Sequence, residues 1–124
     1  TSRARKILPP EVRREDAVHN IQCAALMVGA MACGDLQLFA TAFDDRLHQE
    51  QRYRLIKGAK RVLRSARAAG ALAAGLSGAG PTLIAFTDGD GVAIRQAMRR
   101  AWFACGVHPK VQILEQDNQG AQGC

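Results

Sequence analysis

The stretch Gly75–Thr82 constrains the fold of this chain more than any other. Three glycines, a serine and a threonine fall within eight residues, between the small-residue run 71–74 and the apolar run Leu83–Phe86. Because glycine allows positive φ and close approach of the backbone, the pattern predicts a tight loop between two short strands. Backbone N–H groups in such a loop can converge on one anion, and the hydroxyls of Ser77 and Thr82 can add donors. A plain hairpin loop without a ligand is the alternative.

The composition indicates one globular domain with an acidic partner or a basic solvated surface. The chain has 124 residues, 48% of them hydrophobic and 23% charged, which is ordinary for a folded domain. No apolar run approaches the roughly 20 residues of a membrane span and no secretory signal is present, so we expect a cytoplasmic protein without a membrane partner. The net charge of +6 suits a phosphate, a carboxylate or another anion.

The cysteines offer a weak metal hypothesis. His19 and Cys23 share a helix face, and Cys33 follows ten residues later, but no C-x-x-C pair is present. We therefore expect free thiols in a reducing compartment and no metal site in this chain, with a zinc site as the alternative.

The first half of the chain predicts three helices. A short helix covers 1–8 and ends at a Pro-Pro pair, and a long helix covers 13–33. Gly34 and Asp35 then end one helix and cap the next, which we expect to run to about residue 45. The apolar stripe of the long helix, at three- and four-residue steps, predicts its buried face: Val18, Ile21, Ala25, Val28 and Ala32.

The second half predicts a polar connector at 44–54 and then an α/β alternation. A further helix is expected at 58–69 with a basic outer face, another at 91–105 anchored by Trp102 and Phe103, and a last strand at 110–115. The basic face lacks interleaved aromatics, so we expect no nucleic-acid partner. The order gives an α+β fold: a small, mostly antiparallel sheet of ferredoxin-like type with helices packed on one face.

Three motifs in order resemble the homoserine kinases, a family of the GHMP kinase superfamily. Leu76–Thr82 is similar to the superfamily's third motif, and 1–9 is similar to the start of the C-terminal half. The run Asp45-Arg46-Leu47-His48-Gln49 with Arg52 is similar to the family's Asp-x-Leu-His-Gln-Pro-Tyr-Arg, although positions 50 and 51 are Glu and Gln here. No Gly/Ser-rich phosphate loop of the form Pro-x-x-x-Gly-Leu-Gly-Ser-Ser-Ala is present, so we expect a fragment or processed product that lacks the N-terminal ATP-binding domain.

The resemblance implies a transfer of the γ-phosphoryl group of ATP to L-homoserine, with ATP and Mg²⁺ bound mainly by the N-terminal half. It implies that Arg5 and Arg52 hold the substrate carboxylate and that Thr1 lies near the transferred phosphoryl group. It also implies a phosphate-proximal loop made of Ser77, Gly78, Ala79, Gly80 and Thr82. On this interpretation residues 1–117 form the GHMP kinase C-terminal domain, 118–124 form a mobile tail, and the chain alone is inactive.

Two other interpretations stay open. Another GHMP kinase would act on a sugar or a mevalonate-type substrate, but galactose has no carboxylate for the two arginines. A stand-alone α+β module would bind an amino acid or RNA without catalysis, yet the strand candidates expose only Phe86 as an aromatic platform. The sequence leaves the oligomeric state open, a homodimer included.

Overall fold

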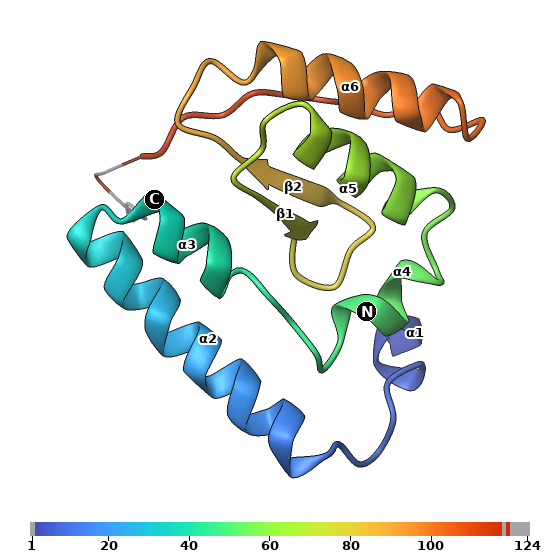
Figure 1. Cartoon of the computed structure of the whole chain (residues 1–124). Helices are drawn as coiled ribbons and strands as arrows, with labels where there is room; N and C mark the ends of the chain where they lie inside the picture. Colours follow the sequence, from blue (N-terminus) through green and yellow to red (C-terminus); the bar gives the residue numbers. More distant parts are fainter. Residues whose placement is uncertain (1, 118, 120–124) are drawn as a thin grey trace.

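The computed structural model describes residues 2–117 and 119, and among these it contains six helices and two strands (Figure 1). In chain order they are α1 (Ser2–Lys6), α2 (Arg14–Cys33), α3 (Leu36–Ala42), α4 (Gln49–Tyr53), α5 (Ala59–Ala68), β1 (Ala73–Leu76), β2 (Leu83–Phe86) and α6 (Val92–Phe103). The expected α+β class is confirmed. Thr1 and most of the expected tail at 118–124 lie outside the described residues.

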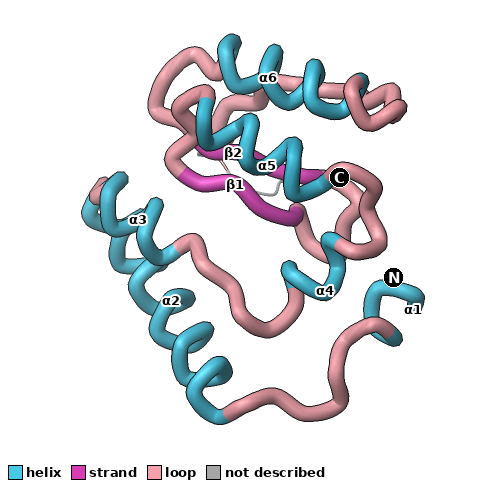
Figure 2. Tube along the Cα trace, turned by 45° about the vertical axis from the view of Figure 1, so that its right-hand side comes forward, coloured by secondary structure: helices cyan, strands magenta, loops and turns pink. Residues whose placement is uncertain are grey.

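The two strands form an antiparallel hairpin whose turn is the glycine-rich stretch. Ala73 pairs with Phe86 at one end and Leu76 pairs with Leu83 at the other, next to the loop. An isolated two-stranded hairpin is marginally stable in water, so helices must cover it. Figure 2 shows α5 and α6 on one side of the strands and α2 with α3 on the other. The sequence predicts helices on one face of the sheet, and α5 and α6 cover that face. The second face is covered as well, by α2 and α3.

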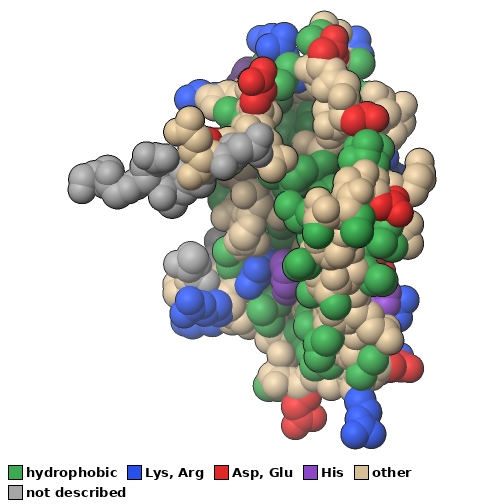
Figure 3. Space-filling model, turned by 90° about the vertical axis from the view of Figure 1, so that its left-hand side faces the viewer, with side chains coloured by type: hydrophobic (Ala, Val, Ile, Leu, Met, Phe, Trp, Pro, Cys, Tyr) green, Lys and Arg blue, Asp and Glu red, His purple; other side chains and the backbone are tan. Residues whose placement is uncertain are grey.

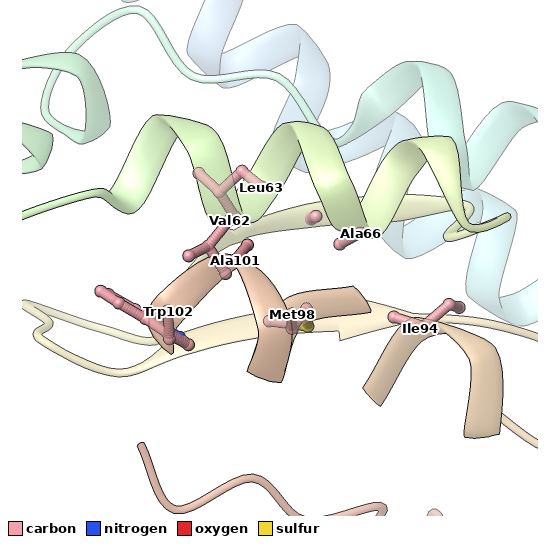
Figure 4. Packing of buried hydrophobic residues seen from close by; sticks show 8 residues of the cluster. Val62, Leu63, Ala66, Ile94, Met98, Ala101 and Trp102 are labelled. Carbon is pink, nitrogen blue, oxygen red and sulfur yellow. The ribbon is translucent and has the colours of Figure 1, made fainter. Parts of the chain in front are cut away.

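The larger apolar core lies between α5, α6 and β1 (Figure 4). Val62 is fully buried, and its neighbours in α6 include Met98 and Trp102. The predicted inward residues of α5, Ala59, Val62 and Ala66, are all buried. Phe103 was expected to anchor α6 with Trp102, but that prediction is wrong. Its side chain is 43% exposed and its ring lies against His108 at the rim.

A smaller core fills the other face of the hairpin. Phe39 of α3 packs edge-on against Phe86 of β2, with ring centroids 5.2 Å apart, and Phe43 joins both rings. Ala30 of α2 and Ala73 of β1 complete this cluster, and both are buried. Consecutive residues of β1 therefore enter different cores, Ala73 the smaller and Ala74 the larger, as the two-residue period of a strand requires.

The ends of α2 and α3 follow the sequence prediction, although their lengths differ. Gly34 adopts φ of 69° at the end of α2, and the Asp35 carboxylate accepts a 2.9 Å hydrogen bond from the backbone N–H of Leu38. α3 ends at Ala42, three residues before the predicted end. The connector that looked aperiodic contains α4, which was not predicted.

The predicted buried stripe of α2 is wrong. Val18, Ile21 and Val28 are 45%, 69% and 70% exposed, and Ala25 and Ala32 are exposed as well. The helix instead turns Cys23 and Ala30 inward. Both faces of α2 are apolar, so helical periodicity alone could not tell which one packs against the hairpin.

The predicted strand at 110–115 is also wrong. The chain turns back after α6 and runs along it without pairing to either edge of the hairpin (Figure 1). Ile113 and Leu114 are 43% and 82% exposed, so this segment does not bury alternate side chains. A strand needs a neighbouring strand to pair its backbone N–H and C=O groups, and no described strand lies beside this segment.

No described helix is long and apolar enough to cross a membrane.

We predict that the fully buried Val62 contributes much more to stability than an exposed valine. Val62→Ala removes two buried methyl groups and leaves a cavity, so the free energy of unfolding should fall by about 2 kcal/mol. Val12→Ala is the matched control because Val12 is 50% exposed, and its effect should stay below about 0.5 kcal/mol. Urea unfolding measures both, and equal losses would contradict the assignment of the core.

Candidate functional site

The glycine-rich loop closes on itself and leaves its tip open to solvent. The Ser77 N–H donates to the Thr82 carbonyl oxygen at 2.9 Å, and the Gly80 N–H donates to the Ser77 carbonyl oxygen at 3.1 Å. Gly80 has φ of 77°, and a Cβ there would lie 2.9 Å from Ile56, so only glycine fits. Ser77, Gly78 and Thr82 are exposed. Within the described chain, the backbone N–H groups of Gly78 and Ala79 donate to no other residue.

Arg52 joins the three sequence motifs at one place. Its Nη1 donates to the Gly78 carbonyl oxygen of the loop at 3.3 Å, and its Nε donates to the Ala4 carbonyl oxygen of α1 at 3.4 Å. The same Nη1 lies 3.3 Å from Nδ1 of His48, one turn earlier. Figures 1 and 2 both show α1 beside α4. The fold thus brings Arg52 into contact with residues that lie 48 and 26 positions away in the chain.

The departure at positions 50 and 51 does not move Arg52 away from the loop. Glu50 points outward and pairs with Lys60, while Gln51 is half-buried within α4. Because both residues continue the helix, Arg52 stays one helical turn after His48, on the side that meets the loop.

Gln49 fixes α4 to the strand that leads into the loop. Its Oε1 accepts hydrogen bonds from the Leu76 backbone N–H at 2.8 Å and from the Tyr53 hydroxyl at 2.6 Å. A Cβ at Gly75 would lie 2.5 Å from this oxygen and 2.7 Å from the Phe43 ring. Burial raises the pKa of Tyr53. We did not single out Gln49 from the sequence, although it lies inside the recognised motif.

Asp45 holds the start of α4. Its carboxylate accepts from the backbone N–H groups of His48 and Gln49, at 2.9 and 2.7 Å, and from the Asn20 side chain at 2.8 Å. Burial alone would raise the pKa of Asp45, whose side chain is only 7% exposed. The three hydrogen bonds and the nearby His48 ring outweigh burial and hold that pKa below its ordinary value. No motif or periodicity singled out Asn20.

The arginine expected on α1 is available for a ligand. Arg5 is exposed, and within the described chain its side chain makes no hydrogen bond or ion pair. Thr1 lies outside the described residues. The structure therefore places Arg52 and the loop in contact, and places Arg5 on the helix whose backbone Arg52 contacts.

The alternative zinc site is not formed in the part of the chain that the structure describes. Cys23 Sγ lies 3.4 Å from Nε2 of His19, but that nitrogen also lies 2.8 Å from the Asp44 carboxylate. Cys33 is ten residues further along α2, about 15 Å away, and is exposed. Within residues 2–117 and 119, no group of three or more His, Cys, Asp or Glu side chains lies close enough together to hold a metal ion.

We predict that Gly75→Ala destabilises the protein by about 1–3 kcal/mol. The new methyl group displaces Gln49, so the Leu76 N–H and the Tyr53 hydroxyl lose their acceptor. Gly29→Ala is the control, because nothing lies within 4 Å of that position in α2 and alanine favours a helix. The comparison uses melting temperatures, and a Gly75→Ala variant as stable as Gly29→Ala would refute the role of Gln49.

We predict that Asp45→Asn lowers stability at pH 7 by about 1–2 kcal/mol, because the amide accepts more weakly than the carboxylate. The folded pKa of Asp45 is depressed, so its contribution is complete above the unfolded value of 3.8 and is lost as pH falls through the folded pKa. The gap between wild type and variant should therefore close below about pH 4.

The control for this pH profile is Asp44→Asn. Asp44 is the neighbouring carboxylate, with a side chain that is 56% exposed, and its exposed pair with His19 should contribute less than about 0.5 kcal/mol. Urea unfolding at a series of pH values measures all three proteins. A gap between wild type and Asp45→Asn that stays constant down to low pH would contradict the assigned ionisation.

Comparison with known proteins agrees with this geometry. The sequence profile of the family described as GHMP kinases C terminal matches residues 23–104. A homoserine kinase from Moorella thermoacetica is 45% identical over 118 residues, which is 95% of this chain and 40% of that protein. A homoserine kinase from Microchaete diplosiphon is 42% identical over 122 residues, which is 98% of this chain and 40% of that protein.

A solved structure is also similar to this chain. The crystal structure of homoserine kinase from Cytophaga hutchinsonii matches with a TM-score of 0.81 at 31% identity, covering 84% of this chain and 34% of that one. This chain spans about 40% of the length of the two curated relatives. The resemblance inferred from the three motifs is confirmed. The family profile covers more than half of the chain, and the chain belongs to the GHMP kinases.

Proposed function

We propose that this chain is the C-terminal half of an ATP-dependent homoserine kinase, which converts L-homoserine to O-phospho-L-homoserine. The observation that carries the proposal is Arg52, which touches both α1 and the glycine-rich loop. The relatives named homoserine kinase support the substrate. A cytoplasmic location accompanies this proposal, since free cysteines suit a reducing compartment.

The substrate carboxylate binds between Arg5 and Arg52 in this proposal. A guanidinium pairs with a carboxylate through two parallel hydrogen bonds, and two arginines fix both the position and the plane of an amino acid. Arg52 is half-buried and held by backbone carbonyls, so its position is set before substrate arrives. Arg5 is exposed and can close on the carboxylate from α1.

The loop faces the transferred phosphoryl group. The N–H groups of Gly78 and Ala79 can donate to phosphate oxygens, and the exposed hydroxyls of Ser77 and Thr82 can add to them. Thr1 lies near the same group in this proposal. ATP and Mg²⁺ bind mainly to the N-terminal half, where Mg²⁺ neutralises charge on the phosphates.

The reaction is an in-line phosphoryl transfer. The homoserine hydroxyl oxygen forms a bond to the γ-phosphorus as the bond from that phosphorus to the β-γ bridging oxygen breaks, and the hydroxyl proton is lost to base. ADP leaves with the bridging oxygen. This chemistry depends on positioning and on charge stabilisation rather than on a covalent group of the enzyme. Both halves are therefore needed, and the 124-residue chain alone should release no ADP.

The other candidates give different results in the same assay. ADP release by the full-length protein is compared with homoserine, mevalonate and galactose as acceptors. Turnover with galactose or mevalonate instead of homoserine would assign another GHMP kinase. Amino-acid binding without any ADP release would favour a binding module.

We predict that Arg52→Ala in the full-length protein raises the KM for homoserine about 10- to 100-fold, as expected from losing a charge-assisted pair of about 1.5–3 kcal/mol. Arg5→Ala should act in the same direction. Arg54→Ala is the matched control, because Arg54 is exposed two residues later and makes no contact with the loop in the described chain. Homoserine kinetics unchanged by both Arg5→Ala and Arg52→Ala would remove the arginines from the site.

A further inference from the structure

The imidazole of His48 contacts Arg52, and the proposed function gives this ring no role. Nη1 of Arg52 lies 3.3 Å from Nδ1 of His48. The two residues stand four positions apart, at the start and near the end of α4, so both side chains project from one side of the helix. Figure 3 shows histidine side chains beside Lys or Arg side chains at the molecular surface, and the His48 side chain is 36% exposed.

The backbone of His48, and not its ring, begins α4. The His48 N–H donates to the Asp45 carboxylate at 2.9 Å. Its carbonyl oxygen accepts from the backbone N–H of Arg52 at 3.1 Å, which is the first hydrogen bond of the helix. The ring itself makes no capping hydrogen bond. Its contact with Arg52 therefore has a purpose other than starting the helix.

The two neighbours of the ring select one tautomer. A guanidinium carries only N–H donors, so its contact with Nδ1 is a hydrogen bond only when Nδ1 has a lone pair. In a neutral imidazole the proton is then on Nε2. Nε2 of His48 lies 3.4 Å from the Asp45 carboxylate, and an anion at this place favours an N–H over a lone pair. Arg52 and Asp45 thus favour the same tautomer from different sides of the ring.

The ring also decides which nitrogen of Arg52 stays open. Nε donates to the Ala4 carbonyl oxygen, and Nη1 donates to the Gly78 carbonyl oxygen. With Nδ1 of His48 as a further acceptor, both N–H groups of Nη1 are supplied. Nη2 donates to no other residue of the described chain. It is therefore the nitrogen that faces a ligand.

We propose that His48 is a positioning residue for Arg52. Its neutral ring, with the proton on Nε2, accepts from Nη1 through Nδ1 and holds the guanidinium with Nη2 turned to the ligand. The proposal rests on the proposed function, in which Arg52 binds the substrate carboxylate. Without the ring, Nη1 keeps only the Gly78 oxygen, and a more mobile side chain has to be ordered when the substrate binds.

The kinetic test uses the full-length protein. His48→Leu should raise the KM for homoserine about 5- to 20-fold and leave kcat and the KM for ATP within about two-fold, because the carboxylate is held equally before and during the transfer. His48→Asn should recover most of the loss, since its Oδ1 is bonded to Cγ, as Nδ1 is, and can accept from Arg52. His48→Gln places its amide where Nε2 lies and should not recover it.

A double-mutant cycle separates positioning from a general loss of stability. In the Arg52→Ala background, His48→Leu should change the KM for homoserine by less than about two-fold, because the group that the ring positions is gone. In the Arg54→Ala background it should keep its full effect. Arg54 is the matched control because it is exposed and its side chain contacts neither the ring nor the loop in the described chain. A purely structural role predicts the same loss in all three backgrounds.

The tautomer is measured by nitrogen-15 NMR of the full-length protein, without any turnover. At about pH 8 an ordinary histidine side chain is neutral, and its protonated and unprotonated nitrogens have well-separated resonances. The signals that vanish in His48→Gln belong to His48. We expect Nε2 to carry the proton and Nδ1 to carry none. Arg52→Leu should shift the Nδ1 resonance, and Arg54→Leu should leave it in place.

Each result decides the proposal. A proton on Nδ1 overturns it, and so does an unchanged KM for homoserine in His48→Leu or an equal loss in all three backgrounds. If circular dichroism shows that His48→Leu does not fold, His48→Gln takes its place in the cycle with the same expected rise in KM. If the full-length protein phosphorylates no homoserine, the proposed function fails. The NMR spectra with and without Arg52 then decide whether the ring holds the guanidinium.

Discussion

The contact between Gln49 and the end of β1 is the constraint on which the candidate site depends. One amide oxygen accepts from the Leu76 N–H and from the Tyr53 hydroxyl, so the five-residue helix α4 is tied to the strand that leads into the loop. Arg52 follows on that helix and reaches the Gly78 carbonyl oxygen of the loop. The contact in turn requires Gly75, since no side chain fits between the strand and α4.

Local sequence signals predicted the elements whose formation depends on their own residues. The glycine-rich turn, the two strands beside it and the helix end at Gly34 and Asp35 all follow from short-range chemistry. The buried face of α2 was mispredicted because both of its faces are apolar, and only the tertiary fold selects between them. The strand predicted at 110–115 does not form, for a related reason. A strand needs a neighbouring strand to pair with, and an alternating sequence does not show whether one is present.

The residues of the candidate site also fall into those that motifs predict and those that only the structure reveals. Arg5, Arg52 and the loop were found through motifs, and the structure shows how Arg52 bridges α1 and the loop. No motif identified the roles of Gln49 and Asn20, which hold these pieces in place. An uncharged amide carries no sequence signal of its importance until its partners are known, and Asn20 finds its partners 25 and 26 residues away in the chain.

The ionised carboxylate of Asp45 gives the protein two regions with different responses to acid. Among the described residues, those buried in the cores are apolar and none is polar or charged, so the packing of α5 and α6 on the hairpin does not depend on a proton. The start of α4, by contrast, is held to α2 through the Asp45 carboxylate, beside a hydrogen bond from the Arg46 N–H to the Asn20 side chain. Protonation of Asp45 therefore weakens the start of α4, whereas the bond between Gln49 and β1 involves no group that titrates with acid. In amide hydrogen exchange, α4 would then behave as a separate opening unit rather than as part of the global transition.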